Sequence, residues 1–374
     1  MKILLVSMPS IHFTRWASQL KDAGHEIHWF DILNGGYNKD LKWVTQHTDW
    51  RYRLGDFRGR VFLKKHLPKL HGLLEKNVEI EFERILKVVQ PDAVHSFVMY
   101  KCCVPIFPVM QRYKNIKWIY SSWGSDLFHF KNLPNYREDL EMVLPHIDYL
   151  ITDNQRDSKI AQELGFRNKF LGSFPGGGGF HLEELEQFVN PVSPRNIILV
   201  KGYQGRSGRA IPVIRALNQL NEDLKEYQIV IFGADLEVIN YLNILNIPKN
   251  WIVYAKLGHL EVLKTMGQAH VYIGNSLSDG MPNTLLEAII MGAFPIQSNP
   301  GNATAEIIEN GTNGLLIEDA ENSEEIKKLI LSAITNDSLI KNAFDINQEL
   351  KYSLGFELIK EQVLKAYNQI EKEL

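Results

Sequence analysis

The sequence predicts an α/β protein made of two domains, each with a parallel sheet of the Rossmann type. Its 374 residues exceed what a single hydrophobic core usually serves, and this length favours two domains. The chain opens with an apolar strand at residues 2–7, a helical stretch that ends at Gly24 and a second strand from His25, which together form a βαβ unit. A strand, a glycine-punctuated loop and a helix follow again at residues 196–217, so a second unit of this kind begins there.

The composition is that of an ordinary globular protein. Hydrophobic residues make up 45% of the chain and charged residues 23%, with a net charge of −3, so bulk charge indicates neither disorder nor a polyanionic partner. The two cysteines, Cys102 and Cys103, are adjacent, which suits neither a disulfide nor a metal site and favours a reducing cytosol. The apolar run at residues 3–6 is too short for a signal peptide or a membrane span, so we expect a cytoplasmic protein.

The loop after the first strand excludes one common use of a Rossmann domain. Residues 8–16 contain no glycine and therefore lack the GxGxxG pattern of dinucleotide-binding proteins, which disfavours an NAD-dependent dehydrogenase. We expect an amphipathic helix after this loop, with Ala17, Leu20 and Ala23 on its apolar face.

A glycine run and two prolines mark the boundary between the domains. Residues 173–180 read SFPGGGGF, a stretch that would hold regular structure only at a high cost in backbone entropy, and Pro191 and Pro194 follow. We place the boundary between Gly176 and Pro194. This gives domains at residues 1–185 and 186–355, with a final helix at residues 356–374.

A basic segment rich in aromatic residues occupies positions 42–71. Eight Lys or Arg stand there against two acids, a net charge of +6, and five Trp, Tyr or Phe residues are interleaved with them. This composition suits contact with an anionic membrane surface, and by itself it also allows nucleic acid. A charged helical hairpin that covers the first sheet is the alternative.

Residues 275–302 combine a loop, a helix and a short apolar strand. Pro282 suits the first helical position, and Gly292 followed by Pro295 ends the helix, so we expect a helix at residues 282–291. The N–H groups of Asn283, Thr284 and Leu285 would then point outward with partial positive charge and offer donors to a phosphate or polyhydroxyl ligand.

Two acids in this stretch are spaced for one elongated ligand. Glu287 lies five residues past Pro282, roughly 7 to 8 Å along the helix axis, so Asp279 and Glu287 could hold two ends of the same molecule. The alternative is that Asp279 only caps the helix and Glu287 is a solvated helix residue.

The glycine-punctuated loop at residues 201–209, hereafter the glycine-rich loop, brings cations to the start of a helix. Lys201, Arg206 and Arg209 alternate there with Gly202, Gly205 and Gly208. Cations and exposed N–H groups before a helix N-terminus can bind a diphosphate. The alternative is that these residues are ordinary solvated surface charges.

The string DGMPNTLLEA, followed by MGAFPIQSNPG, resembles the C-terminal signature of retaining GT-B glycosyltransferases of family 4, the glycogen-synthase-like or group 1 transferases. The pattern is an acid, Gly, a bulky apolar residue, Pro and a glutamate eight positions after the acid. Asp279 stands where this family more often has Glu, and Glu287 takes the place that holds the ribose hydroxyls of the nucleotide. The resemblance is strong over the second half of the chain and follows only the order of elements in the first half.

This resemblance implies two facing Rossmann-like domains, with the donor on the second, the acceptor on the first and the last helix packed back on the first. The implied activity is retaining transfer of a sugar from a nucleotide-diphosphate sugar to a saccharide or lipid-linked saccharide, in bacterial cell-surface polysaccharide or glycolipid biosynthesis. A nucleotide-sugar epimerase or hydrolase and a non-catalytic partner subunit of the same fold are the alternatives. No nucleic-acid partner is implied, and the protein would be cytoplasmic or peripheral on the inner face of the membrane.

The resemblance also implies site residues. Retention is attributed in this family to front-face attack, in which the leaving phosphate oxygen takes the acceptor proton, so no metal and no further cofactor is expected. Catalytic roles would fall to Lys201, Arg206 or Arg209, Asp279 and Glu287. Further donor contacts are expected from Gly202, Gly233, Lys256, Leu257, Gly280, Met281, Pro282, Asn283 and Thr284.

Four residues of the first half are candidates for the acceptor or sugar side. His12 and Arg15 lie in the loop that faces the acceptor in this family, and His95 ends a strand that often carries a cleft-facing His. Asp126 could hold a sugar hydroxyl or cap a turn. Solvated positions for His12 and Arg15 and a core position for His95 are the alternatives. Trp123 stands where many members have a His that contacts the donor sugar, so that role is not transferred.

Overall fold

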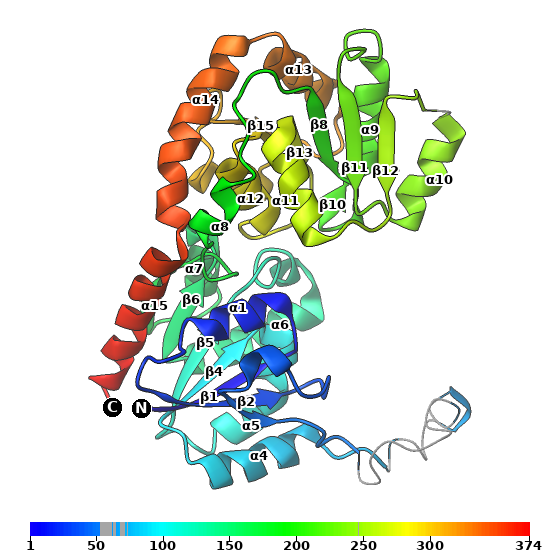
Figure 1. The fold of residues 1–374 in the computed structure, drawn as a ribbon. Helices are drawn as coiled ribbons and strands as arrows, with labels where there is room; N and C mark the ends of the chain where they lie inside the picture. Colours follow the sequence, from blue (N-terminus) through cyan, green and yellow to red (C-terminus); the bar gives the residue numbers. More distant parts are fainter. Residues whose placement is uncertain (53–61, 63–64, 68–71, 73, 246) are drawn as a thin grey trace. The chain divides into compact units, whose positions relative to one another are not determined.

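The computed structural model describes residues 1–52, 62, 65–67, 72, 74–245 and 247–374 (Figure 1). These residues form two compact units. The N-terminal unit comprises Met1–Asp153, Asp157–Gly178 and Lys360–Leu374, and the C-terminal unit comprises Asn154–Arg156 and Gly179–Ile359. Each unit contains one parallel sheet with helices, so the predicted α/β fold class with two parallel-sheet domains is confirmed.

The N-terminal sheet has seven parallel strands in the order β3-β2-β1-β4-β5-β6-β7. The strands are β1 (Lys2–Ser7), β2 (Glu26–Asp31), β3 (Thr45–His47), β4 (Ala93–Phe97), β5 (Lys117–Ser121), β6 (Tyr149–Thr152) and β7 (Lys169–Ser173). Before the domain linker, the α-helices that lie wholly within the described residues are α1 (Ile11–Ser18), α4 (Val78–Val89), α5 (Phe107–Met110), α6 (Pro134–Val143) and α7 (Gln155–Glu163), and a π-helix lies at Met99–Cys103.

Side chains of the interior strands pack on both faces of this sheet, as expected for a parallel sheet covered on both sides. Leu4 and Val6 join the core cluster that includes Phe82 and Ile85 of α4. The other face carries an aromatic layer, in which the Phe13 ring of α1 lies 5.0 Å from Trp29 and 5.5 Å from Phe97 between ring centroids.

The first helix begins earlier than predicted. Ser10 caps α1, since its Oγ accepts the N–H of Phe13 at 3.1 Å, and the helix starts at Ile11 instead of after residue 16. His12 and Arg15 therefore lie on the helix and not in the expected loop. The predicted continuation to Ala23 is also wrong, because α1 ends at Ser18 and turns lead to Gly24, whose φ is +78°.

The C-terminal sheet has six parallel strands in the order β12-β11-β8-β13-β14-β15. They are β8 (Ile197–Lys201), β11 (Gln228–Phe232), β12 (Trp251–Tyr254), β13 (Ala269–Gly274), β14 (Phe294–Ser298) and β15 (Leu315–Ile317). The helices are α8 (Leu182–Glu186), α9 (Ala210–Gln219), α10 (Leu236–Leu245), α11 (His259–Gln268), α12 (Asn283–Met291), α13 (Ser323–Ile334), α14 (Asp337–Leu350) and α15 (Phe356–Glu371).

Helices cover both faces of this second sheet (Figure 1). Ile198 and Val200 of β8 pack in the cluster with α9, α10, α13 and α14, whereas Leu199 between them packs in the cluster with α11 and α12. The order of the strands reverses at β8, which pairs with β11 on one side and with β13 on the other. In open parallel sheets such a switch point leaves a crevice at the carboxyl ends of the strands, where ligands bind.

The last helix contributes to the N-terminal unit from Lys360 onward. Tyr367 is fully buried there, and its hydroxyl accepts the indole N–H of Trp16 at 3.3 Å. The terminal ammonium group of Met1 forms an ion pair with Glu371. No helix in the described part of the chain is long and apolar enough to cross a membrane.

Much of the basic segment at residues 42–71 lies outside the described residues, namely positions 53–61, 63–64 and 68–71. Its expected helical cover and membrane contact therefore stay predictions. Trp50 is described and belongs to the core, because it is buried and its indole N–H donates to the Asp31 carbonyl at 2.7 Å.

We predict that Gly267→Ala destabilises the C-terminal unit. A Cβ at Gly267 in α11 would lie 1.9 Å from the Phe188 carbonyl oxygen, and backbone atoms would have to move apart. We expect a loss of at least about 2 kcal/mol in the free energy of unfolding, measured by urea denaturation. Gly258→Ala is the control, because its Cβ would meet nothing within 4 Å, and it should cost no more than about 1 kcal/mol. Equal losses in both variants would contradict the packing argument.

Candidate functional site

The candidate site lies at the carboxyl edge of the C-terminal sheet, at its switch point. β8 ends at Lys201 and continues into the glycine-rich loop, and β13 ends at Gly274 and continues into residues 275–282, hereafter the signature loop. The two loops are bonded together, because the N–H groups of Leu277 and Ser278 donate to the Arg206 carbonyl at 3.0 and 3.2 Å. The structure thus brings together the two stretches that the sequence singled out.

The glycine-rich loop forms a small antiparallel hairpin of β9 (Gln204–Gly205) and β10 (Gly208–Arg209), which the sequence did not predict. Two of its glycines are required by close backbone approach. A Cβ at Gly202 would lie 2.9 Å from the Phe232 carbonyl oxygen, and one at Gly208 would lie 2.5 Å from the Tyr203 carbonyl oxygen. These contacts fold the hairpin tightly over the carboxyl end of β8.

Lys201 and Asp279 form an oppositely charged pair at this edge. Lys201 Nζ lies 4.0 Å from Asp279 Oδ2, and the side chains are only 11% and 21% exposed. Lys201 Nζ also lies 5.1 Å from the centroid of the Tyr203 ring. Asp279 accepts the N–H of Gly280 at 3.0 Å through Oδ1, so it also closes its own turn. The site therefore offers a partly buried cation beside a carboxylate.

The two arginines of the loop differ in their surroundings. Arg209 is the N-cap of α9 and is half-buried, and its guanidinium forms an ion pair with Glu321. Its Nε is buried and has no hydrogen-bond partner among the described residues. Arg206 is exposed on the hairpin. Of the two arginines, Arg209 is the one that stands at a helix N-terminus, where negative charge is favoured.

Helix α12 begins one residue later than predicted, because Pro282 is its N-cap and Asn283 its first residue. The N–H of Leu285 donates to the Pro282 carbonyl at 3.0 Å, so the expectation that this donor points outward is wrong. Thr284 Oγ1 accepts the hydroxyl of Tyr272 at 2.9 Å. Gly292 ends the helix as predicted, with φ of +72°.

Glu287 is not a solvated helix residue. It is 4% exposed, and its Oε1 lies 2.7 Å from His259 Nε2, whose side chain is 48% exposed. Both residues line a pocket of about 290 Å³. The lining residues are Tyr203, Phe232, Gly233, Ala255, Lys256, Leu257, His259, Val262, Thr284 and Glu287. Of the predicted donor contacts, Gly233, Lys256, Leu257 and Thr284 meet there, whereas Gly202, Gly280, Met281, Pro282 and Asn283 are not among its lining residues.

Sequence reasoning missed three features of this site: the contact of His259 with Glu287, the position of Tyr203 and the bonds of Arg156. His259 is far from Glu287 in the sequence, so no spacing pattern links them. Tyr203 lies over Gly233, where a Cβ would lie 2.3 Å from Tyr203 Cε1. Arg156 is buried in the same unit, where it donates to the Asp279 carbonyl at 2.9 Å and also to the Pro300 carbonyl. Arg156 thus holds the backbone of the signature loop.

Among the candidates of the N-terminal unit, His95 lies in the core. It is fully buried, with Nδ1 at 2.6 Å from the Tyr367 hydroxyl and Nε2 at 2.8 Å from Ser121 Oγ. Burial lowers the pKa of His95 to about 3, so its ring is neutral. Both ring nitrogens are used within the unit, which corresponds to the core alternative. On α1, His12 is exposed and Arg15 is half-buried.

Asp126 is buried and bonded. Its Oδ2 accepts the N–H of Met99 at 2.7 Å and the Tyr120 hydroxyl, while Oδ1 has no partner among the described residues. Burial raises the pKa of Asp126 to about 7, and the nearby charge of Asp157 adds to this shift. Asp126 therefore anchors the π-helix at Met99–Cys103. The described residues contain no group of three or more His, Cys, Asp or Glu that could hold a metal ion.

Both halves of the chain match known protein families. Residues 183–349 match the glycosyl transferases group 1 family, and residues 2–154 match the glycosyl transferase 4-like family. A stretch of 139 residues is 33% identical to an uncharacterised glycosyltransferase of Methanocaldococcus jannaschii. That match covers 34% of this chain and spans only about a third, 33%, of the length of the relative.

Two solved structures share the whole fold. The sucrose-phosphate synthase of Thermosynechococcus elongatus has a TM-score of 0.74 at 15% identity, and the alignment covers 100% of both chains. HepE of Anabaena, solved with UDP-glucose, has a TM-score of 0.72 at 11% identity over 99% of this chain and 100% of its own.

These findings define a protein with the GT-B fold of glycosyltransferases. More particularly, the first half of the chain is similar to the glycosyl transferase 4-like family and the second half to the glycosyl transferases group 1 family.

We predict that Asp126 makes stability fall as pH rises from about 4 to 7. Asp126 has a pKa of about 7 in the folded state and of 3.8 in the unfolded state. Between these two pH values the folded state therefore binds more protons than the unfolded state. The free energy of unfolding should fall by up to about 1.4 kcal/mol per pH unit from this residue. Urea denaturation of Asp126→Asn should lack this slope, while the exposed control Asp40→Asn should keep it. Parallel pH profiles for wild type and Asp126→Asn would refute the buried-carboxyl account.

Proposed function

We propose that this protein transfers a glycosyl group from a nucleotide-diphosphate sugar to a saccharide or lipid-linked saccharide, with retention at the anomeric carbon. The observation that carries the proposal is Glu287, a carboxylate that is 4% exposed and lines a pocket at the switch point of the C-terminal sheet. A buried carboxylate in a binding pocket suits ligand hydroxyls. The families of both domains and the UDP-glucose bound by HepE support a nucleotide-sugar donor.

The site residues have distinct proposed tasks. Glu287 accepts the ribose hydroxyls, and Gly233, Lys256 and Leu257 form the wall for the base. Lys201 and Arg209 neutralise the diphosphate, and Asp279 beside Lys201 accepts a sugar hydroxyl. Cations that are already positioned where charge develops lower the barrier without reorganisation.

The reaction proposed is a front-face substitution. The bond between the anomeric carbon and the phosphate oxygen breaks, and its electron pair leaves with the nucleotide diphosphate. The acceptor hydroxyl oxygen forms the new bond, and its proton passes to the leaving phosphate oxygen. Lys201 and Arg209 stabilise the charge on that phosphate, so the step needs no enzymic nucleophile.

The test is mass-spectrometric screening of a nucleotide-sugar panel, with and without saccharide and polyprenyl-linked acceptors and with EDTA in one arm. Proton NMR of the products reads their anomeric and ring configuration. We expect acceptor-dependent release of the nucleotide and a product with the donor's anomeric configuration, both unaffected by EDTA. Sugar loss or isomerisation without acceptor would point to a hydrolase or epimerase, and donor binding without turnover to a non-catalytic subunit. Loss of activity in EDTA that Mg²⁺ or Mn²⁺ restores would overturn the metal-free step.

The acceptor side of the proposal rests on the N-terminal unit. We assign acceptor contacts to His12 and Arg15 on α1, and peripheral contact with anionic membrane to residues 42–71. Cosedimentation with vesicles of graded anionic content tests the membrane contact.

We predict that Glu287→Gln weakens binding of the bare nucleotide diphosphate by about tenfold or more. The lost carboxylate would remove charge-assisted hydrogen bonds worth roughly 1.5 to 3 kcal/mol each. Isothermal calorimetry measures the affinity, and Glu261→Gln on the exposed side of α11 is the matched control. An affinity within about twofold of wild type would make Glu287 a structural residue.

We predict that Arg209, and not Arg206, binds the diphosphate. Arg209→Gln should lower the affinity for the nucleotide diphosphate by about tenfold, because its guanidinium is placed at the α9 N-terminus by Glu321 and keeps a buried unused donor. Arg206→Gln should stay within about threefold of wild type. The reverse ranking in the same calorimetric titration would assign the role to Arg206.

A further inference from the structure

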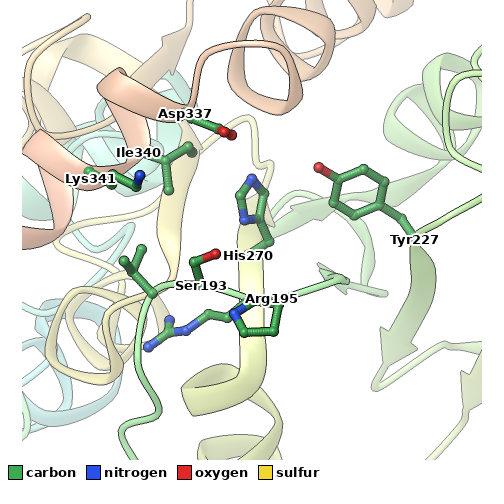
Figure 2. A pocket seen from close by; sticks show the side chains of 9 residues that line it. Ser193, Arg195, Tyr227, His270, Asp337, Ile340 and Lys341 are labelled. Atoms are coloured by element: carbon green, nitrogen blue, oxygen red, sulfur yellow. The ribbon is translucent and has the colours of Figure 1, made fainter.

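A second polar pocket, of about 180 Å³, lies in the C-terminal unit away from the candidate donor site. The side chains that line it are drawn in Figure 2 and include Ser193, Arg195, Tyr227, His270, Asp337 and Lys341. Tyr227 immediately precedes β11 and His270 is the second residue of β13, so the pocket lies at the amino edge of the sheet. The donor-site pocket follows the carboxyl ends of β11 and β12, at the opposite edge.

His270 is the unexplained group in this pocket. It is 9% exposed, and neither of its ring nitrogens has a hydrogen-bond partner among the described residues. Burial lowers the pKa of His270, the charge of Asp337 raises it and that of Arg195 lowers it further, so the ring presents one N–H donor and one acceptor. A water molecule takes about 30 Å³ in the liquid, so one water does not fill this pocket.

Arg195 supplies a buried positive charge beside His270. Its guanidinium donates to the carbonyls of Pro191, Ala269, Gly292 and Asn190, at 3.0 Å for Pro191 and 3.1 Å for Ala269. These partners are neutral, and no salt bridge of the described residues includes Arg195. Burial lowers the pKa of Arg195 to about 10, which still leaves it charged at neutral pH.

The charges of the remaining lining residues indicate which ligand charge the pocket would bind. Lys341 and Asp337 are exposed on α14 and contribute opposite charges, so together with Arg195 the pocket carries one excess positive charge. A monoanion matches this excess, whereas a dianion would meet the Asp337 carboxylate uncompensated. The hydroxyls of Ser193 and Tyr227 and the ring of His270 can hydrogen-bond hydroxyl groups.

We propose that this pocket binds a small hydroxylated carboxylate of the sugar-acid class, with the carboxylate toward Arg195 and Lys341 and hydroxyls toward His270 and Tyr227. The proposal does not depend on the donor site, because no residue is shared between the two pockets.

The test uses three hexoses that differ only at C6, added to the full-length protein with ¹⁵N-labelled histidine. D-glucuronate carries a carboxylate, D-glucose a neutral hydroxymethyl group and D-glucose 6-phosphate a phosphate. We expect D-glucuronate to shift the His270 ring signals in a saturable way, with binding at least about tenfold tighter than either analogue. His270→Phe serves to assign those signals.

A matched pair of lysine variants locates the carboxylate. Lys341→Gln should weaken D-glucuronate binding at least about fivefold, and Lys328→Gln, an exposed lysine on α13, should leave it unchanged. Three outcomes would overturn the proposal: unchanged His270 signals at every probe concentration, equal binding of all three hexoses, or equal binding by Lys341→Gln and wild type. The readout needs no turnover, so it stands apart from the transferase assay.

Discussion

The reversal of strand order at β8 is the constraint on which the candidate site depends. β8 pairs with β11 on one side and β13 on the other, so the loops that leave β8 and β13 pass to opposite faces and leave a crevice between them. The glycine-rich loop and the signature loop fill the rims of this crevice. Lys201 and Asp279 come within 4.0 Å only because their strands are neighbours, although they are distant in sequence. Glycine at positions 202 and 208 lets the glycine-rich loop lie close to the backbone of Phe232 and Tyr203.

The sequence predicted the fold class because parallel strands are continuous apolar runs, and the end of α12 because Gly292 is a strong breaker. It missed the start of α1, where Ser10 caps the helix three residues before the buried Phe13. It also missed the hairpin at Gln204–Arg209, since strands of two residues leave no periodic pattern. The local signal was sufficient at Gly292, whose left-handed backbone favours glycine, and it failed at the Ser10 cap and at the two-residue strands.

The two loops of the site were predictable from the sequence, but the contacts between their side chains and other residues were not. The spacing of the two acids predicts Glu287 as a ligand residue, yet its burial and its contact with His259 arise from the packing of α11 against α12. The ion pair of Arg209 with Glu321 and the bonds of Arg156 to the signature loop likewise join residues far apart in sequence. For His95 the strand was predictable from the sequence but its neighbours were not, and Tyr367 near the end of the chain occupies its Nδ1. Contacts of this kind join residues far apart in the sequence, so no local sequence pattern predicts them.

The two edges of the C-terminal sheet hold their cations in different ways, and this difference has consequences for selectivity. At the carboxyl edge Lys201 and Arg209 each face a carboxylate, Asp279 and Glu321. A singly charged ligand gains little there, because it competes with charges already present, whereas a diphosphate brings enough charge to engage both cations. At the amino edge Arg195 is held by neutral carbonyls, and Asp337 and Lys341 carry opposite charges, so one excess positive charge remains for the monoanion proposed above. Under the two proposals, the sheet separates two classes of ligand by charge: each cation at the carboxyl edge is paired with a carboxylate, whereas Arg195 at the amino edge is bonded to neutral carbonyls.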